Sequence, residues 1–210
     1  MDITYYGGGC VLLGTKPLKI VIDPLSGEYG PNPKIKADVA LFTQPPQAET
    51  KAVTDTTITW PGEYELQSVL IEGVAARLHT EEDVSKQDGV MYAVSYSGLR
   101  AVVLGNVHPE LSDEQLDRLD GADILIAPVG GHGLTPDKES VSKLVRQFDP
   151  NFVVPVHYDD GVVNYPVPQA EVKEFLSEVG GGDVAPQSNL KVTSKEAVEQ
   201  TQFVVLDPKQ

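Results

Sequence analysis

Cysteine is nearly absent from this sequence, which contains Cys10 and no other cysteine among its 210 residues. An intrachain disulfide is therefore excluded, and the composition favours a reducing compartment. Cys10 follows a glycine turn at the expected start of a strand, so a small buried hydrophobic residue is its simplest interpretation. A nucleophilic role would need a histidine beside the thiol in the folded chain, which the sequence by itself does not reveal.

Positive charge is also scarce, since 16 Lys and Arg residues stand against 31 Asp and Glu and give a net charge of −15. Proteins that bind nucleic acids engage phosphates with clustered Lys and Arg, and no such cluster occurs here. We therefore expect no nucleic-acid partner. The acidity itself is typical of a soluble protein.

Long apolar runs are missing as well, because no segment approaches the roughly 18 apolar residues that a membrane helix requires. No basic-then-apolar leader opens the chain. We therefore expect a soluble, cytoplasmic protein with no membrane association. Its length fits a single domain over residues 1–210 with enough chain to bury a core.

The first half of the chain has the periodicity of strands, and the second half alternates helices with strands. The expected early strands are Asp2–Tyr6, Cys10–Leu13, Leu18–Ile22, Ala37–Thr43, Thr56–Trp60 and Val69–Leu78. Ser97-Gly98 is typical of a hairpin turn between strands Val90–Tyr96 and Leu99–Leu104. Later strands are expected at Ala122–Val129, Asn151–Val156, Leu190–Thr193 and Gln202–Leu206.

Three helices are expected in the second half. Ser112 with Gln115 forms a capping box for the first helix, which Gly121 suits as a stop. Thr135-Pro136 is expected to open a second helix, whose end Pro150 follows and whose apolar face consists of Val141, Leu144, Val145 and Phe148. A third helix is expected over Pro168–Val179. Pattern alone predicts an α/β protein with mixed sheets.

Several short motifs follow one another in a recognisable order. They are ITYYGGGC (3–10), KIVIDP (19–24), ADVALFT (37–43), PGEYE (61–65), VVLGN (102–106), ADILIAPVGG (122–131) and VVPVHY (153–158). In this order the chain resembles the metallo-β-lactamase superfamily, with the closest likeness to its small bacterial branch of uncharacterised metal-dependent hydrolases. The resemblance covers most of residues 1–160 and implies a four-layer αββα sandwich.

The resemblance also implies where metal ligands would stand. In that family the strand matching residues 37–43 runs into His-X-His-X-Asp-His, and this chain has Gln44, Pro46, Ala48 and Glu49 at those four positions. Where the family has a histidine in its N-terminal turn and an aspartate after the VVLG strand, this chain has Gly8 and Asn106. The family also has a histidine ligand after the VVP strand, and His157 stands there. It is the one matching metal ligand that this chain keeps.

Other candidate residues are expected in loops on the same rim. They are Asp23, His108, His132, Asp159 and Asp160, and the simplest interpretation of each histidine is a surface or supporting role. Gly130-Gly131-His132-Gly133 before a helix could cradle an anion, although a tight structural turn is the simpler interpretation.

Two functional hypotheses follow. The first is a pseudoenzyme without catalytic residues, metal or other cofactor, which binds a small molecule or a protein partner. The alternative is a metal-dependent hydrolase with a mononuclear zinc site rebuilt around His157 and Glu49. A homo-oligomer is compatible with both hypotheses. The sequence names no ligand, substrate or pathway.

Overall fold

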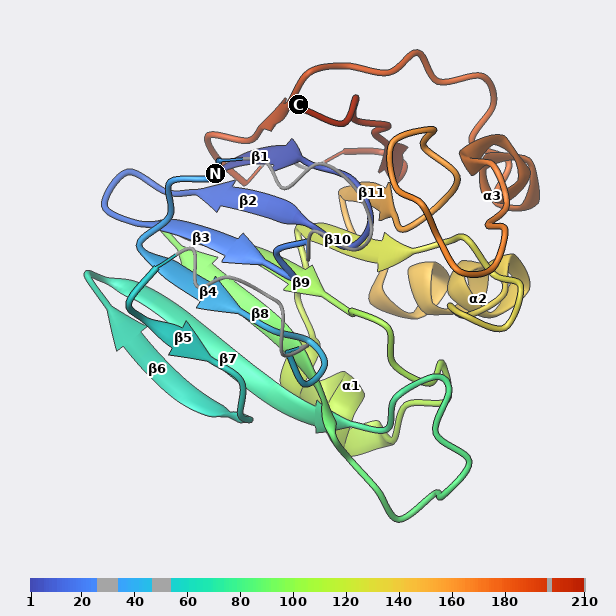
Figure 1. Ribbon diagram of the computed structural model, residues 1–210. Helices are drawn as coiled ribbons and strands as arrows, with labels where there is room; N and C mark the ends of the chain where they lie inside the picture. The colour runs from blue at the N-terminus through green and yellow to red at the C-terminus, as the bar shows by residue number, and fades with distance from the viewer. Residues whose placement is uncertain (26–33, 47–53, 196–197, 210) are drawn as a thin grey trace.

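The computed structural model describes residues 1–25, 34–46, 54–195 and 198–209. Two β-sheets pack face to face, and the chain builds the first sheet mainly from its N-terminal strands (Figure 1). The order in this first sheet is β12 (Leu190–Lys191), β1 (Asp2–Tyr5), β2 (Val11–Gly14), β3 (Lys19–Ile22), β4 (Val39–Leu41) and β5 (Thr57–Ile58). Strands β3, β4 and β5 run parallel to one another, so their carboxyl ends meet at one edge.

The second sheet combines an antiparallel part with a parallel part. Its order is β13 (Gln202–Phe203), β11 (Phe152–Val156), β10 (Ile124–Pro128), β9 (Leu99–Val103), β8 (Gly89–Tyr96), β7 (Val69–Ala76) and β6 (Gly62–Leu66). Strands β9, β10, β11 and β13 are parallel. Every residue of β10 and β11 is buried, as expected for strands covered on both faces.

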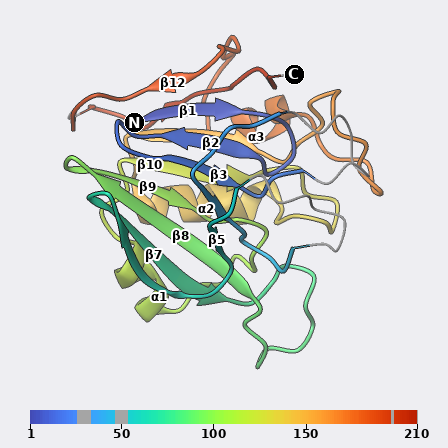
Figure 2. The same cartoon turned by 60° about the vertical axis from the view of Figure 1, so that its left-hand side comes forward.

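The helices that the structure describes lie over the second sheet, on its side away from β1–β5 (Figures 1 and 2). Helix α1 (Asp113–Leu119) contacts β7, and α2 (Lys138–Phe148) contacts β10. Helix α3 (Val172–Glu178) packs on α2, and its Phe175 ring meets Phe203 of β13 edge-on. None of the described helices has the length and apolar character needed to cross a lipid bilayer.

Several local predictions are confirmed. Ser112 accepts a hydrogen bond from the Gln115 backbone N–H, and the Gln115 side chain accepts one from the Ser112 N–H, which completes the capping box of α1. Ser97 and Gly98 form the hairpin turn between β8 and β9, both with positive φ. The predicted α/β sandwich is confirmed by the two packed sheets and by the described helices, which cover the outer face of the second sheet.

Other element boundaries were predicted wrongly. Helix α2 begins at Lys138 rather than at Pro136, because the Asp137 carboxylate caps the Ser140 N–H while the Thr135 hydroxyl is held by the Gly131 N–H. Helix α3 begins at Val172, four residues after Pro168. The strand expected over Ala37–Thr43 is shortened to Val39–Leu41.

One hydrophobic core joins the inner faces of the two sheets and continues beneath α2. The hydroxyl of Tyr92, in β8, donates to the carbonyl oxygens of Phe42 and Ile58 in the first sheet, at 3.0 and 3.2 Å. The Val90 N–H donates to the Thr43 carbonyl at 2.8 Å. These bonds tie the end of β4 to the second sheet and so fix the edge where the strand ends meet.

Candidate functional site

A pocket of about 250 Å³ opens where strands of both sheets end. Its walls come from the residues that follow the carboxyl ends of β3, β4, β9 and β11, together with the end of β10. Open α/β sheets place their ligands at this kind of edge, because there the backbone leaves the ladder and side chains converge. The lining residues are Gly8, Gly9, Asp23, Pro24, Leu25, Phe42, Thr43, Gln44, Pro45, Pro46, Thr80, Val103, Gly105, Asn106, Pro128, Leu134, Val156, His157, Val163, Tyr165 and Pro166.

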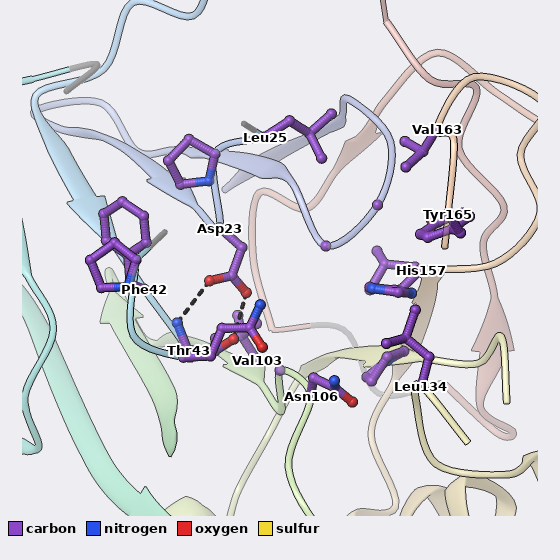
Figure 3. A pocket seen from close by; sticks show the side chains of 18 of the residues that line it. Asp23, Leu25, Phe42, Thr43, Val103, Asn106, Leu134, His157, Val163 and Tyr165 are labelled. Atoms are coloured by element: carbon purple, nitrogen blue, oxygen red, sulfur yellow. Dashed lines mark hydrogen bonds between the residues drawn. The ribbon is translucent and has the colours of Figure 1, made fainter. Parts of the chain in front are cut away.

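Asp23 and Thr43 form one side of the pocket (Figure 3). The Thr43 N–H donates to Oδ1 of Asp23 at 2.8 Å, and the Thr43 hydroxyl donates to Oδ2 at 2.5 Å. Burial raises the pKa of Asp23 to about 6, although both hydrogen bonds from Thr43 act in the opposite direction. A carboxylate in this position therefore carries a charge that its surroundings do not fully compensate.

His157 and Tyr165 lie on the opposite side, with their ring centroids 4.8 Å apart (Figure 3). His157 directly follows β11 and has a left-handed backbone with φ of 53°. Its N–H donates to the Gly8 carbonyl at 2.7 Å, which joins the end of β11 to the N-terminal turn. Burial lowers the pKa of His157 to about 4, so the imidazole is neutral at physiological pH.

Three buried polar atoms of the lining lack a hydrogen-bond partner within the described part of the chain. They are Asn106 Oδ1, His157 Nδ1 and the Tyr165 hydroxyl oxygen. A buried polar atom without a partner costs about 1–3 kcal/mol, and such atoms are uncommon in native proteins. A ligand or a water molecule that reached them would supply the missing bonds.

The glycine turn at residues 7–9 closes the pocket beside His157. Asp160 holds this turn in place, because its Oδ2 accepts hydrogen bonds from the Tyr5 hydroxyl at 2.7 Å and from the Gly8 N–H at 3.3 Å. Gly8 has φ of +61°, and a Cβ there would come within 2.9 Å of Leu25. The left-handed backbone favours glycine at this position, whereas the flexible Leu25 side chain can move away from an added Cβ.

The structure brings most of the sequence-predicted residues together. Gly8, Asp23, Gln44, Pro46, Asn106 and His157 all line the pocket. Ala48 and Glu49 lie outside the described residues, so the proposed role of Glu49 as a ligand stays a prediction.

His108 and His132 are not among the residues that line the pocket. The His108 ring stacks on that of His79 at 6.3 Å between centroids. His132 is exposed, in a turn whose Gly131 N–H donates to the Thr135 hydroxyl oxygen at 2.6 Å. The helix after this turn is capped by the Asp137 carboxylate, whose charge opposes an anion at that position.

Sequence reasoning overlooked Tyr165. Thr43 and Leu134 belong to loops expected at this rim, but the sequence does not reveal that Thr43 is the hydrogen-bond partner of Asp23. Tyr165 lies between Gly161 and Pro166 in a segment that was given no element. An aromatic residue in such a loop was the available signal, because loops that carry large side chains often contribute to binding sites.

A zinc ion takes three or four His, Cys, Asp or Glu ligands. Within residues 1–25, 34–46, 54–195 and 198–209, no three such side chains lie close enough together to hold a metal ion. Asp23 and His157 are the lining residues of those types, and both oxygens of Asp23 already accept hydrogen bonds from Thr43. The described residues alone therefore do not fit a zinc site.

Comparisons with known proteins agree with this fold. A UPF0173 protein of Pyrococcus abyssi is 27% identical over 180 residues, which cover 75% of this chain and 83% of the relative. A Thermotoga maritima structure assigned to the metallo-β-lactamase superfamily superposes with a TM-score of 0.75 at 20% identity, covering 98% of this chain and 97% of the other. Igni18, a metallo hydrolase from Ignicoccus hospitalis, superposes with a TM-score of 0.67 at 16% identity, covering 100% and 96% of the two chains.

The model of the family described as "Beta-lactamase superfamily domain" matches residues 2–157. The matched segment begins at β1 and ends at His157, so it contains all the strands whose ends form the pocket. The chain therefore belongs to the β-lactamase superfamily and has the metallo-β-lactamase fold.

Proposed function

We propose that this chain is a non-catalytic member of its family, a pseudoenzyme whose strand-end pocket binds a small molecule without a metal ion. The observation that carries the proposal is the donor set of the pocket. Gly8, Gln44, Pro46 and Asn106 line it at positions where the family resemblance places metal ligands. Glycine, proline and neutral amides bind divalent zinc poorly.

The remaining ionisable groups of the pocket support a binding role. A dinuclear hydrolase works because its metal ions lower the pKa of a bound water. A general base without metal would need a pKa near the working pH, whereas burial lowers the pKa of His157 to about 4. The pKa of Asp23, about 6, lies nearer the working pH, but no lysine or arginine lines the described pocket to stabilise a hydroxide formed from water. His157 is therefore unsuited to activating water, and Asp23 would have to do so without electrostatic assistance.

The size of the pocket favours a small molecule over a protein segment. Its volume of about 250 Å³ lies just below the range for drug-sized ligand pockets, roughly 300–1,000 Å³, so only a small ligand fits. Walls from Leu25, Phe42, Leu134 and Val163 supply apolar contact, and Asp23 and Asn106 supply polar contact. This combination is typical of small-molecule sites.

A metal-dependent hydrolase with a rebuilt mononuclear site is the alternative. The observation in its favour is the buried Nδ1 of His157, which has no hydrogen-bond partner within the described residues. Glu49, the other proposed ligand, lies outside the described residues. A third ligand would still be required.

Metal content separates the two functions. We expect protein purified without a metal-binding tag or chelator to contain no stoichiometric zinc, manganese or iron by elemental analysis. We also expect chelator to leave the melting temperature unchanged, because a metal bound only to the native state would raise it by mass action.

Two histidine variants provide the control for this experiment. Near-equimolar metal that is lost in His157→Ala but kept in His132→Ala would contradict the proposal and support the hydrolase. Metal lost only in His132→Ala, which removes an exposed side chain outside the pocket, would be adventitious and would leave the proposal intact.

A further inference from the structure

The pocket has a one-sided charge distribution. No lysine or arginine occurs among its described lining residues, and Asp23 is the lining carboxylate. The imidazole of His157 is neutral at physiological pH because burial lowers its pKa. The side chains of the lining therefore contribute a single negative charge with no cation to balance it.

Asp23 keeps hydrogen-bonding capacity for a ligand. Each of its oxygens accepts one hydrogen bond from Thr43, and a carboxylate oxygen has two lone pairs, so each oxygen can accept another. The side chain is only partly buried and borders the pocket. A cation placed there would compensate a charge that burial now disfavours.

The remaining walls of the pocket fit the apolar body of an organic cation. Leu25, Leu134 and Val163 are apolar, and the rings of Phe42 and Tyr165 add aromatic surface (Figure 3). Aromatic faces attract cations, with gains of about 0.5–2 kcal/mol. Asn106 contributes a buried amide oxygen without a partner in the described residues, which is an acceptor for an N–H group.

We propose that the pocket binds a small organic cation, a primary amine carried on an apolar body, with the ammonium group paired to Asp23. This inference rests on the proposed metal-free binding function and names its ligand class. An anion would lose its hydration shell and meet Asp23 without any compensating cation. The net charge of −15 also draws cations toward the protein and repels anions.

Three probes that share one ring and differ in charge test the proposal: benzylamine, benzyl alcohol and benzoate. Binding to tag-free, chelator-treated protein is measured by titration calorimetry, or by NMR where affinity is low. We expect benzylamine to bind at least about fivefold more tightly than benzyl alcohol, which corresponds to roughly 1 kcal/mol, and benzoate to bind most weakly. Equal binding of the amine and the alcohol, or failure of all three to bind, would overturn the proposal.

Two asparagine variants with the same net charge separate local pairing from the general field of the protein. Asp23→Asn should abolish the preference for benzylamine over benzyl alcohol. Asp159→Asn should keep it, because Asp159 is exposed and is not among the lining residues. A preference that survives Asp23→Asn would contradict the assignment of Asp23.

A third variant tests the charge argument with Asp23 in place. Leu134→Lys adds a cation to the lining and should shift the preference toward benzoate, which also covers the case that Asp23→Asn does not fold. Benzoate binding that disappears with chelator would mean that a metal anchors the anion, so the proposed function itself would fail. Benzoate that binds best to chelator-treated wild-type protein would refute only the amine.

Discussion

At the scale of single residues, Asp23 and His157 are the two groups whose ionisation is most strongly linked to folding in the pocket. Burial raises the pKa of Asp23 from its ordinary value of 3.8 to about 6 and lowers that of His157 from 6.5 to about 4. Both shifts have the same cause, since burial disfavours the charged form of each group. Their effects on stability have opposite signs.

Asp23 holds its proton in the folded protein over a pH range in which the unfolded chain has released it. Its contribution to stability is therefore fully present below about pH 4 and is lost as pH rises through about 6. For His157 the unfolded chain takes up the proton first, so stability is lost as pH falls from about 6.5 to 4. Between these limits the two contributions largely cancel.

Asp23→Asn removes the contribution of Asp23 to the pH dependence of the unfolding free energy. We expect wild type to gain stability relative to the variant as pH falls from about 6 to 4, by up to about 3 kcal/mol. Asparagine keeps an oxygen for the Thr43 N–H, so the variant should fold. The free energy of unfolding from urea titrations at several pH values measures the difference. A difference that does not change with pH would contradict the raised pKa of Asp23.

At the scale of elements, the end of β9 and the end of β4 approach each other very closely. Gly105, two residues after β9, has φ of +64°, and a Cβ on it would overlap the side chain of Thr43. Thr43 in turn holds Asp23. The glycine therefore permits the close approach that positions one side of the pocket.

Gly105→Ala should destabilise the protein by about 2–4 kcal/mol, because it adds a steric overlap to the cost of a left-handed backbone. Gly121→Ala is the matched control. Gly121 has φ of +75° but no atom within 4 Å of the added Cβ, so only the backbone cost of about 1 kcal/mol is expected. Urea denaturation of both variants measures the comparison, and equal losses would argue against the packing explanation.

At the scale of the whole molecule, a small number of polar contacts fixes how the two sheets lie on each other. Most of the sheet interface is apolar, and the hydrophobic effect that stabilises it is non-directional. The hydroxyl of Tyr92 donates to the Phe42 and Ile58 carbonyls across this interface. Directional bonds of this kind give the two sheets one relative position.

Tyr92→Phe should cost about 1–2 kcal/mol of unfolding free energy, because it leaves the buried Phe42 carbonyl without the Tyr92 hydroxyl. Tyr96→Phe, at the half-exposed end of the same strand, should cost much less. Thermal or urea unfolding of the two variants checks the expectation. A Tyr92→Phe protein as stable as wild type would mean that the apolar interface alone sets the position.

The sequence by itself determined the local features of this protein. The capping box at Ser112, the hairpin turn at Ser97-Gly98 and the apolar face of α2 each depend on residues a few positions apart. Such short-range preferences act before any tertiary contact forms, so a pattern of letters predicts them. The strand-end motifs carried the family resemblance for the same reason, since each is a short continuous segment.

Only the tertiary structure decided how the pocket is built. Asp23 meets Thr43 across two parallel strands, Gly8 meets His157 across the two sheets, and Tyr165 closes the far side from a loop without a pattern of its own. The start of α2 also differs from the prediction, because the Thr135 hydroxyl accepts a hydrogen bond from the Gly131 N–H and Asp137 caps the helix. These pairings join residues far apart in the chain, and packing of the two sheets selects them rather than any local preference.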